Sequence, residues 1–171
     1  MKSNYIIIPL AVLFAALTGS NVTSNGMEWY ATINLPSFTP SGATIGSVWT
    51  VIFILAAVSA LIVWNNKPGL MSIVKGWIGL GSDLPAPLRR RFIMMVFVLN
   101  AVLNVLWSVI FFGAHNIGVA VVEAAVLGAS VVILMVLIWP VSKLASWLLA
   151  PYAVWVGFAT YLTYCVWVLN K

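Results

Sequence analysis

Five long apolar segments, separated by short polar ones, run along the chain and predict five membrane-spanning helices. We expect the spans at about residues 5–20, 42–64, 91–112, 118–139 and 143–169. These lengths are close to, or above, the roughly 20 apolar residues that a helix needs to cross a bilayer. No alternation of apolar and polar residues repeats at strand length, which argues against a β-barrel. The pattern predicts one all-α domain over residues 1–171, an integral membrane protein folded as a five-helix bundle.

The first apolar segment has an alternative interpretation. Ile6–Ala16 has the length of the apolar part of a secretory signal peptide. Ala15-Ala16-Leu17 is a poor cleavage site, however, and we therefore interpret the segment as the first span.

Composition and charge placement support a membrane protein. Hydrophobic residues make up 63% of the chain and charged residues 6%, whereas about a quarter of a soluble domain is charged. All basic residues but Lys171 fall on the side of the N-terminus, at Lys2, Lys67, Lys75, Arg89, Arg90, Arg91 and Lys143. Positive loops favour the cytoplasm, so we expect a cytoplasmic N-terminus and an external C-terminus. The basic residues therefore set topology and form no nucleic-acid-binding surface.

The segment between the first two spans, residues 21–41, predicts a lid. It is longer than a plain connection between helices, it begins with Trp29 and Tyr30, and Pro36 and Pro40 stiffen its backbone. The charge asymmetry places this loop outside. A long, stiff, aromatic loop is typical of a segment that covers a binding site.

The connection between the second and third spans, Asn65–Arg90, is also long. Apolar residues recur in it at helical spacing, at Leu70, Ile73, Val74, Trp77 and Ile78. This spacing fits a short helix on the membrane surface. An ordered extension of the second span fits it equally well, and we assign the segment no chemistry.

Polar and aromatic residues within the spans indicate where a ligand could bind. In the third span Asn100, Asn104 and Trp107 share one face, which must point into the bundle because an unpaired amide in hydrocarbon is costly. The amides could join helices or orient a ligand. Trp49 and Trp155 also lie inside spans, at depths that can be reached from the lid.

One carboxylate lies within a predicted span. Glu123 lies about one turn into the fourth span, where it could accept a proton, pair with a cation or sit at the membrane interface near His115. We favour the interface.

One histidine, one cysteine and three carboxylates cannot assemble an ordinary metal site. No conventional catalytic constellation is present, so we expect no obligatory cofactor and leave enzyme activity open.

Three blocks carry a family resemblance. They are Trp29–Thr50 with its Leu35-Pro36-Ser37-Phe38-Thr39-Pro40 centre, Leu99–Phe112 with Asn100, Asn104 and Trp107, and Pro151–Thr160 around Trp155. With these blocks the chain resembles the TspO/MBR family, the tryptophan-rich sensory proteins related to the mitochondrial translocator protein. The resemblance covers about Trp29 to Asn170, with the first span fitting in position.

The resemblance implies a five-helix bundle, usually a homodimer, whose pocket is closed by the loop after the first helix. It implies porphyrin or haem-type tetrapyrroles and aromatic drug-like molecules as ligands. By position, the ligand-binding residues would be Tyr30, Trp49, Phe53, Asn100, Asn104, Trp107, Trp155 and Ala159. Some family members promote light-dependent porphyrin degradation, for which Trp155 would be the key, catalytic group.

Departures from the family pattern qualify these implications. Phe38 and Ser41 stand where the family usually carries Trp and Pro, so the lid would close less tightly. Val168 stands where a basic residue would follow Trp167, so we expect weak or no cholesterol recognition.

We therefore expect a receptor or sensor that binds tetrapyrroles in a bacterial or archaeal cell membrane, in contact with membrane lipid and without nucleic acid. Two alternatives stay open. The first is a small transporter that uses Glu123 as its coupling carboxylate, and the second is a regulatory membrane scaffold.

Overall fold

The computed structural model describes residues 3–66 and 86–171, and within them it contains helices and no strand. The main helices are α1 (Asn4–Asn25), α3 (Gly42–Asn65), α4 (Ala86–Ser108), α5 (Ile117–Ile138) and α7 (Ala150–Leu169). Shorter elements are α2 (Met27–Tyr30), the π-helical turn η2 (Val109–Gly113) and α6 (Lys143–Trp147). Five helical stretches are long and apolar enough to cross a membrane. The all-α, five-span prediction is confirmed.

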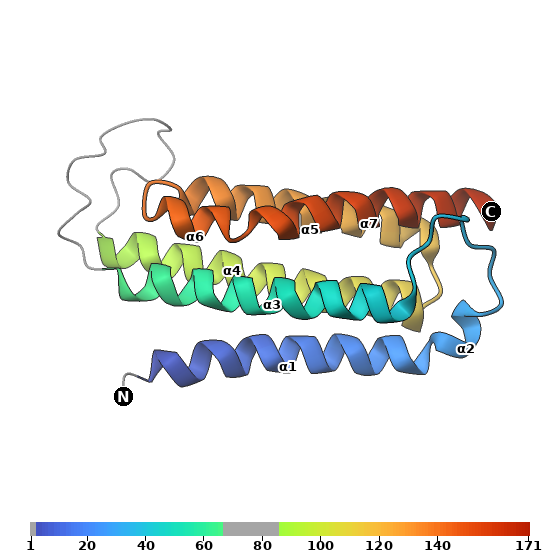
Figure 1. Cartoon of the computed structure of the whole chain (residues 1–171), viewed down its shortest axis with the longest axis horizontal. Coiled ribbons are helices and arrows are strands. Elements are labelled where there is room, and N and C mark those ends of the chain that lie inside the picture. Colours follow the sequence, from blue (N-terminus) through green and yellow to red (C-terminus); the bar gives the residue numbers. More distant parts are fainter. Residues whose placement is uncertain (1–2, 67–85) are drawn as a thin grey trace.

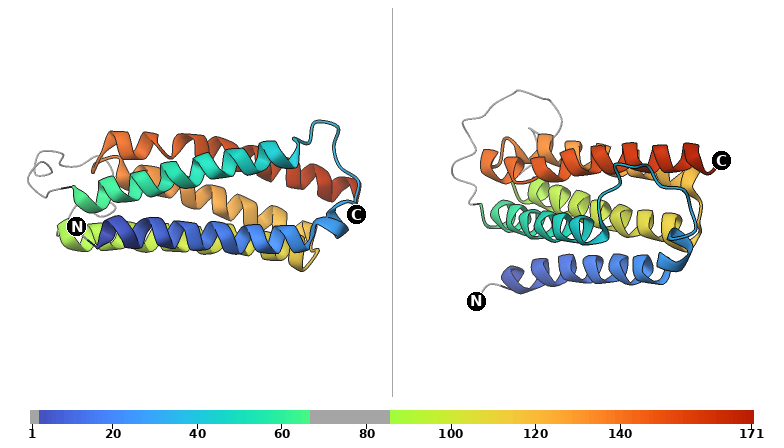
Figure 2. Two further views of the ribbon diagram at one scale, coloured as in Figure 1. Left: turned by 60° about the horizontal axis from the view of Figure 1, so that its bottom comes forward. Right: turned by 45° about the vertical axis from the view of Figure 1, so that its right-hand side comes forward.

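The helices lie side by side along the long axis of the molecule (Figures 1 and 2). α1 packs against α3 and α4, α4 against α5, and α5 against α7, while α6 contacts α3 and α5. The N-terminus lies at one end, and the lid loop and the C-terminus lie at the other (Figure 1). We call these the basic end, which holds Arg89–Arg91 and Lys143, and the lid end.

Two predicted boundaries are wrong. α1 continues to Asn25, past the predicted end at residue 20, so the lid loop proper begins after α2. α4 begins at Ala86 rather than 91, because Pro87 is tolerated in a first helical turn. Most of the Asn65–Arg90 segment lies outside the described residues, including its predicted surface helix.

The fifth span consists of two helices. α6 ends at Trp147 and α7 begins at Ala150, with Pro151 in its first turn. Proline lacks an N–H group, and the first turn is where a helix does not need one. Pro151 therefore marks the start of α7.

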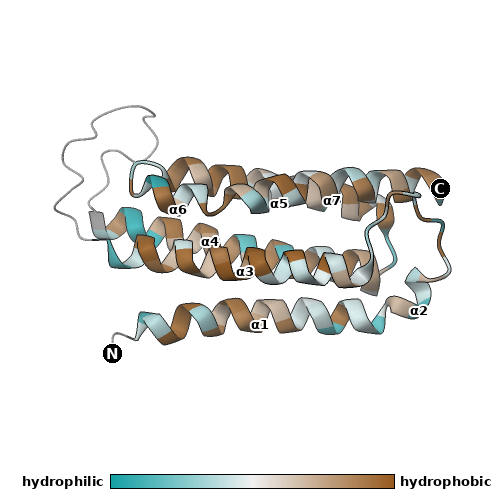
Figure 3. Ribbon diagram, in the orientation of Figure 1, coloured by the Kyte–Doolittle hydropathy of each residue, from teal (hydrophilic) through white to brown (hydrophobic). Residues whose placement is uncertain are grey.

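The core is apolar and lies where α3, α4, α5 and α7 meet. Its fully buried side chains include Ile52, Ile93, Leu134, Ile138 and Leu149. The outer faces are apolar as well (Figure 3), and Phe14 and Val154 are 74% and 75% exposed. Such outer surfaces suit hydrocarbon as solvent.

Candidate functional site

A row of buried amides on α4 faces the middle of the bundle. Asn100 donates to the Ser130 hydroxyl on α5 at 2.8 Å, and Asn104 donates to the Tyr152 hydroxyl on α7 at 3.3 Å. The predicted inward face of the third span is confirmed, because Asn100 and Asn104 are only 6% and 7% exposed. The amides join α4 to both neighbouring helices and fix the Tyr152 ring.

Tyr152 was not predicted. It belongs to a buried stripe on α7 that continues through Val156 and Thr163 to Val166. These positions are four, seven and three residues apart, which are spacings of one helix face. This periodicity, applied to the Pro151–Thr160 block, was the available signal for Tyr152.

Tyr152 connects three of the predicted site residues. Its hydroxyl accepts from Asn104, and its ring meets Trp49 edge-on with centroids 5.9 Å apart. Trp49 in turn stacks on Phe53 at 5.6 Å. These residues therefore form one contiguous group at the centre of the bundle.

An aromatic cluster fills the lid end. Trp107 stacks on Phe111 at 5.1 Å, and Tyr30 lies 6.1 Å from Phe111 and 5.6 Å from Phe112. Trp29 also meets Phe111 edge-on at 5.5 Å. We call Trp29, Tyr30, Trp107, Phe111 and Phe112 the lid-end cluster. It carries two of the predicted site residues, Tyr30 and Trp107.

The backbone of η2 places the rings of this cluster. Ala114 N–H bonds to the Val109 carbonyl at 2.8 Å, a spacing of five residues that widens the helix by one residue. Both Phe111 and Phe112 are thereby buried, at 3% and 8% exposure. π-turns of this kind often occur at functional sites. Burial also raises the pKa of the Tyr30 phenol.

Hydrogen bonds and ring contacts join the lid loop to the C-terminal part of the chain, at α7 and Asn170. Asn170 accepts from the Asn34 backbone N–H at 2.9 Å and donates to the Asn34 carbonyl at 2.8 Å. Phe38 stacks on Tyr161 at 5.9 Å and meets Phe158 at 6.5 Å. Phe38, which stands where the family usually has Trp, thus still packs on α7.

Trp155 and Ala159 lie on α7. Trp155 packs against Phe158 with centroids 5.4 Å apart, so Phe158 connects it to Phe38 of the lid. Ala159 is half-buried one turn further along, and its carbonyl accepts from Thr163. The eight predicted residues thus occupy the lid-end cluster, the centre around Tyr152, and α7. Their joint action on one ligand stays a prediction.

Among the described residues, five buried side-chain polar atoms lack a hydrogen-bond partner; four of them lie on Trp107, Trp155 and Glu123, and the fifth is the Arg90 Nε at the basic end. Within residues 3–66 and 86–171, the indole N–H groups of Trp107 and Trp155 and both carboxylate oxygens of Glu123 have no hydrogen-bond partner. An unpaired buried polar group costs about 1–3 kcal/mol, so each needs an explanation. The two indoles can donate and Glu123 can accept, which is the chemistry that a polar ligand would meet.

The favoured interpretation of Glu123 as an interfacial residue near His115 is wrong. Glu123 is 7% exposed on α5, so its carboxylate is buried within the bundle. His115 lies instead in the turn before α5, where its ring stacks on Trp29 at 4.2 Å. Within the described ranges, no three His, Cys, Asp or Glu side chains gather into a possible metal site.

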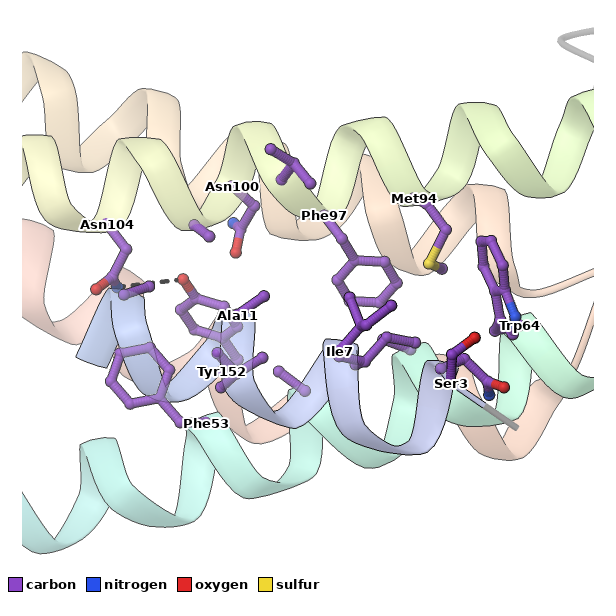
Figure 4. A pocket seen from close by; sticks show the side chains of 18 residues that line it. Ser3, Ile7, Ala11, Phe53, Trp64, Met94, Phe97, Asn100, Asn104 and Tyr152 are labelled. Atoms are coloured by element: carbon purple, nitrogen blue, oxygen red, sulfur yellow. Dashed lines mark hydrogen bonds between the residues drawn. The ribbon is translucent and has the colours of Figure 1, made fainter. Parts of the chain in front are cut away.

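A cavity of about 300 Å³ extends from the centre toward the basic end, between α1, α3 and α4 (Figure 4). Phe53, Asn100 and Asn104 line its inner end together with Tyr152. Ser3 and Trp64 lie at its other end (Figure 4). The cavity thus reaches the predicted central residues from the side opposite the lid.

Comparisons with known proteins agree over the whole length of the chain. The model of the TspO/MBR family matches residues 6–168. The tryptophan-rich protein TspO of Bacillus cereus is 30% identical over 170 residues, 99% of each chain. TspO of Archaeoglobus fulgidus is 32% identical over 94% of this chain and 93% of its own. The human translocator protein is 31% identical over 92% of this chain and 85% of its own.

Proposed function

The chain belongs to the TspO/MBR family, and on this premise we propose that it is a membrane receptor or sensor for porphyrin or haem-type tetrapyrroles. The ligand binds at the lid end, between the lid-end cluster and the Trp155 face of α7. Flat aromatic walls suit a flat aromatic ligand because ring stacking adds to apolar burial. Synthetic aromatic molecules would bind by the same contacts.

The observation that carries this proposal is the pair of unpaired indole N–H groups, on Trp107 and Trp155. A porphyrin presents acidic side groups and ring nitrogens at the rim and centre of an apolar disc. Donors buried among aromatic rings can bind such acceptors without competition from water. The ligand would supply the partners that the two indoles lack.

Access to this site requires the lid to move. The described contacts between the lid and α7 are the exposed hydrogen bonds of Asn34 with Asn170 and Leu169 and the ring contacts of Phe38. Exposed hydrogen bonds exchange with water at a modest net cost of about 1 kcal/mol each. A lid held in this way can open and close over a ligand.

An absorbance titration with protoporphyrin IX tests the proposal. Trp107→Phe and Trp155→Phe keep an aromatic ring and remove one donor, so each should weaken binding about tenfold or more, as expected for a hydrogen bond to a charged group. Trp147→Phe is the matched control, because Trp147 is 61% exposed at the basic end. Equal affinity in all three variants and wild type would overturn the proposal.

We further propose that illumination breaks down the bound porphyrin, with Trp155 as the reacting protein side chain. Its indole is half-buried against Phe158 and its N–H is unpaired, so a porphyrin bound between the lid-end cluster and α7 would lie beside it. In aerobic buffer the porphyrin absorbance bands should fade under light in wild type and persist in Trp155→Phe. Bands that persist in wild type exclude this activity while leaving binding intact.

Glu123 supports a second candidate function, proton-coupled transport. A carboxylate buried within a span and without a partner is a functional site by default, and both Glu123 oxygens meet this description. In proteoliposomes, a pH gradient should then drive porphyrin uptake that Glu123→Gln abolishes. Uptake that persists in Glu123→Gln would remove this candidate.

A further inference from the structure

The cavity between α1, α3 and α4 has a different character from the lid end. Its volume of about 300 Å³ is at the lower limit for small-molecule sites. It is elongated along the helix axes, from Ser3 and Trp64 to Asn104, Phe53 and Tyr152 (Figure 4). This elongated, apolar shape suits a single hydrocarbon chain.

The walls are apolar, and their few polar groups are largely occupied. Ile7, Ala11 and Phe97 line the length of the cavity (Figure 4). At the inner end the Asn104 amide already donates to Tyr152, and at the outer end the Asn4 amide donates to Asn65 at 3.2 Å. A ligand in this channel therefore gains mostly apolar burial.

The cavity opens sideways toward the membrane. Ile7 and Val98 line it and are also 61% and 63% exposed on the outer surface of the bundle. In a bilayer, the molecules next to such an opening are lipid chains. A chain can thus enter between α1 and α4 without passing through water.

The mouth at the basic end carries a cation, and no carboxylate among the described residues pairs with it. Trp64 lines the mouth, and Arg90 lies over its ring at 5.2 Å and donates Nη1–H to its carbonyl at 2.9 Å. Neither partner neutralises the guanidinium charge. The Arg90 Nε is buried and has no hydrogen-bond partner among the described residues. Arginine at such a position is suited to phosphate, which accepts from its fixed fork of donors.

We propose that this cavity is a binding site for an anionic phospholipid, with one acyl chain between α1, α3 and α4 and the phosphate on Arg90. Basic pockets between membrane helices bind anionic headgroups in this manner. The bound lipid fills the gap between α1 and the rest of the bundle. The inner end of this site shares Phe53, Asn100 and Asn104 with the residues predicted to bind a tetrapyrrole, whereas the phosphate would lie at the basic end.

Native mass spectrometry of the full-length protein in mild detergent tests the site. The probes are phosphatidylglycerol and phosphatidylcholine with identical acyl chains. Wild type should retain phosphatidylglycerol over phosphatidylcholine. Arg90→Gln should lower the bound phosphatidylglycerol about fivefold, as expected for one basic residue. Arg91→Gln removes the same charge from an exposed neighbouring residue and should change the amount of bound phosphatidylglycerol little.

A second pair of variants tests the part of the cavity that would hold the acyl chain. Ala101 lines the cavity, whereas Ala57 is half-buried and does not line it. Ala101→Leu should reduce retention of both lipids, and Ala57→Leu should not. Equal retention of the two lipids by wild type, equal effects of Arg90→Gln and Arg91→Gln, or unchanged retention in Ala101→Leu would each overturn the proposal. Thermal unfolding of each variant shows that it is folded.

Discussion

Tryptophans at the two ends of the bundle and tryptophans within it make different contacts. At the basic end, Arg90 lies over Trp64 at 5.2 Å and Lys143 lies over Trp139 at 5.6 Å, and at the lid end Lys171 lies over Trp167 at 5.3 Å, as expected for residues that anchor a helix at a charged interface. Toward the lid end, Trp107 and Trp155 have buried N–H groups and no partner. Tryptophan content alone therefore does not locate a site, whereas depth and pairing do.

The two ends also differ in how they are held together. At the basic end, side chains bond to the backbone of neighbouring segments, as Ser59 does to the Ala145 carbonyl at 2.8 Å and Asn66 to the Val141 carbonyl at 2.6 Å. At the lid end, ring packing and a close backbone contact at Gly26 are joined only by the exposed hydrogen bonds of Asn34 with Asn170 and Leu169 among the described side-chain contacts of the lid. Ring packing has no fixed donor and acceptor pairs, so it can rearrange around a ligand more easily than a hydrogen-bonded junction.

The largest effect is expected at Gly26, where the lid-end backbone is tightest. A Cβ there would lie 2.6 Å from the Phe112 carbonyl oxygen, so Gly26→Ala should force α2 away from η2 and cost about 1–3 kcal/mol. Gly46→Ala is the matched control, because its Cβ would meet nothing within 4 Å and alanine favours the helix. Thermal unfolding in detergent measures both. Equal melting temperatures of the two variants would contradict a tight backbone contact at Gly26.

The next effect is expected at the centre, between the two ends. Tyr152→Phe removes the hydroxyl that accepts from Asn104 and should cost about 0.6–1.7 kcal/mol, the range for hydrogen bonds between membrane helices. Tyr161→Phe serves as control, since Tyr161 is 58% exposed. If chemical unfolding gives the same free energy for both variants, the Asn104–Tyr152 bond contributes nothing to joining α4 and α7.

The smallest effect on stability, and the most specific one, is expected at the hydrogen bonds between the Asn170 side chain and the Asn34 backbone. Asn170→Ala removes the two bonds to the Asn34 backbone, whereas Asn34→Ala removes only its side-chain bond to the Leu169 carbonyl at 3.5 Å. Asn170→Ala should therefore speed amide exchange in the lid several-fold, with a stability loss of about 1 kcal/mol or less. Asn34→Ala should change the rate of amide exchange in the lid less. Equal exchange in both variants would contradict a tether made by Asn170.

Much of this architecture follows from the sequence. The five spans and the inward face of Asn100 and Asn104 are confirmed because apolar length and helical periodicity are local properties. The end of α1 was missed, since residues 21–25 lack a helix breaker and the chain turns only where Gly26 meets Phe112. Here a tertiary contact decided the boundary.

The arrangement of the candidate site was harder to predict, for physical reasons. The π-turn of η2 shifts a hydrogen bond by one residue and leaves no periodic pattern. The Asn34–Asn170 pair joins positions 136 residues apart. The depth at which a residue lies also depends on how its helix tilts. The sequence therefore could not show that Tyr30 and Trp107 lie at the lid end. Nor could it show that Phe53 and Asn104 line the cavity. The buried position of Glu123 was missed for the same reason.

The most direct test asks which end binds the tetrapyrrole. Protoporphyrin IX is titrated against Trp107→Phe, which alters the lid-end cluster, and against Ala101→Leu, which fills the cavity at the other end. We expect Trp107→Phe to weaken binding about tenfold and Ala101→Leu to leave the affinity at the wild-type value. Weakened binding in Ala101→Leu together with wild-type affinity in Trp107→Phe would contradict a site under the lid.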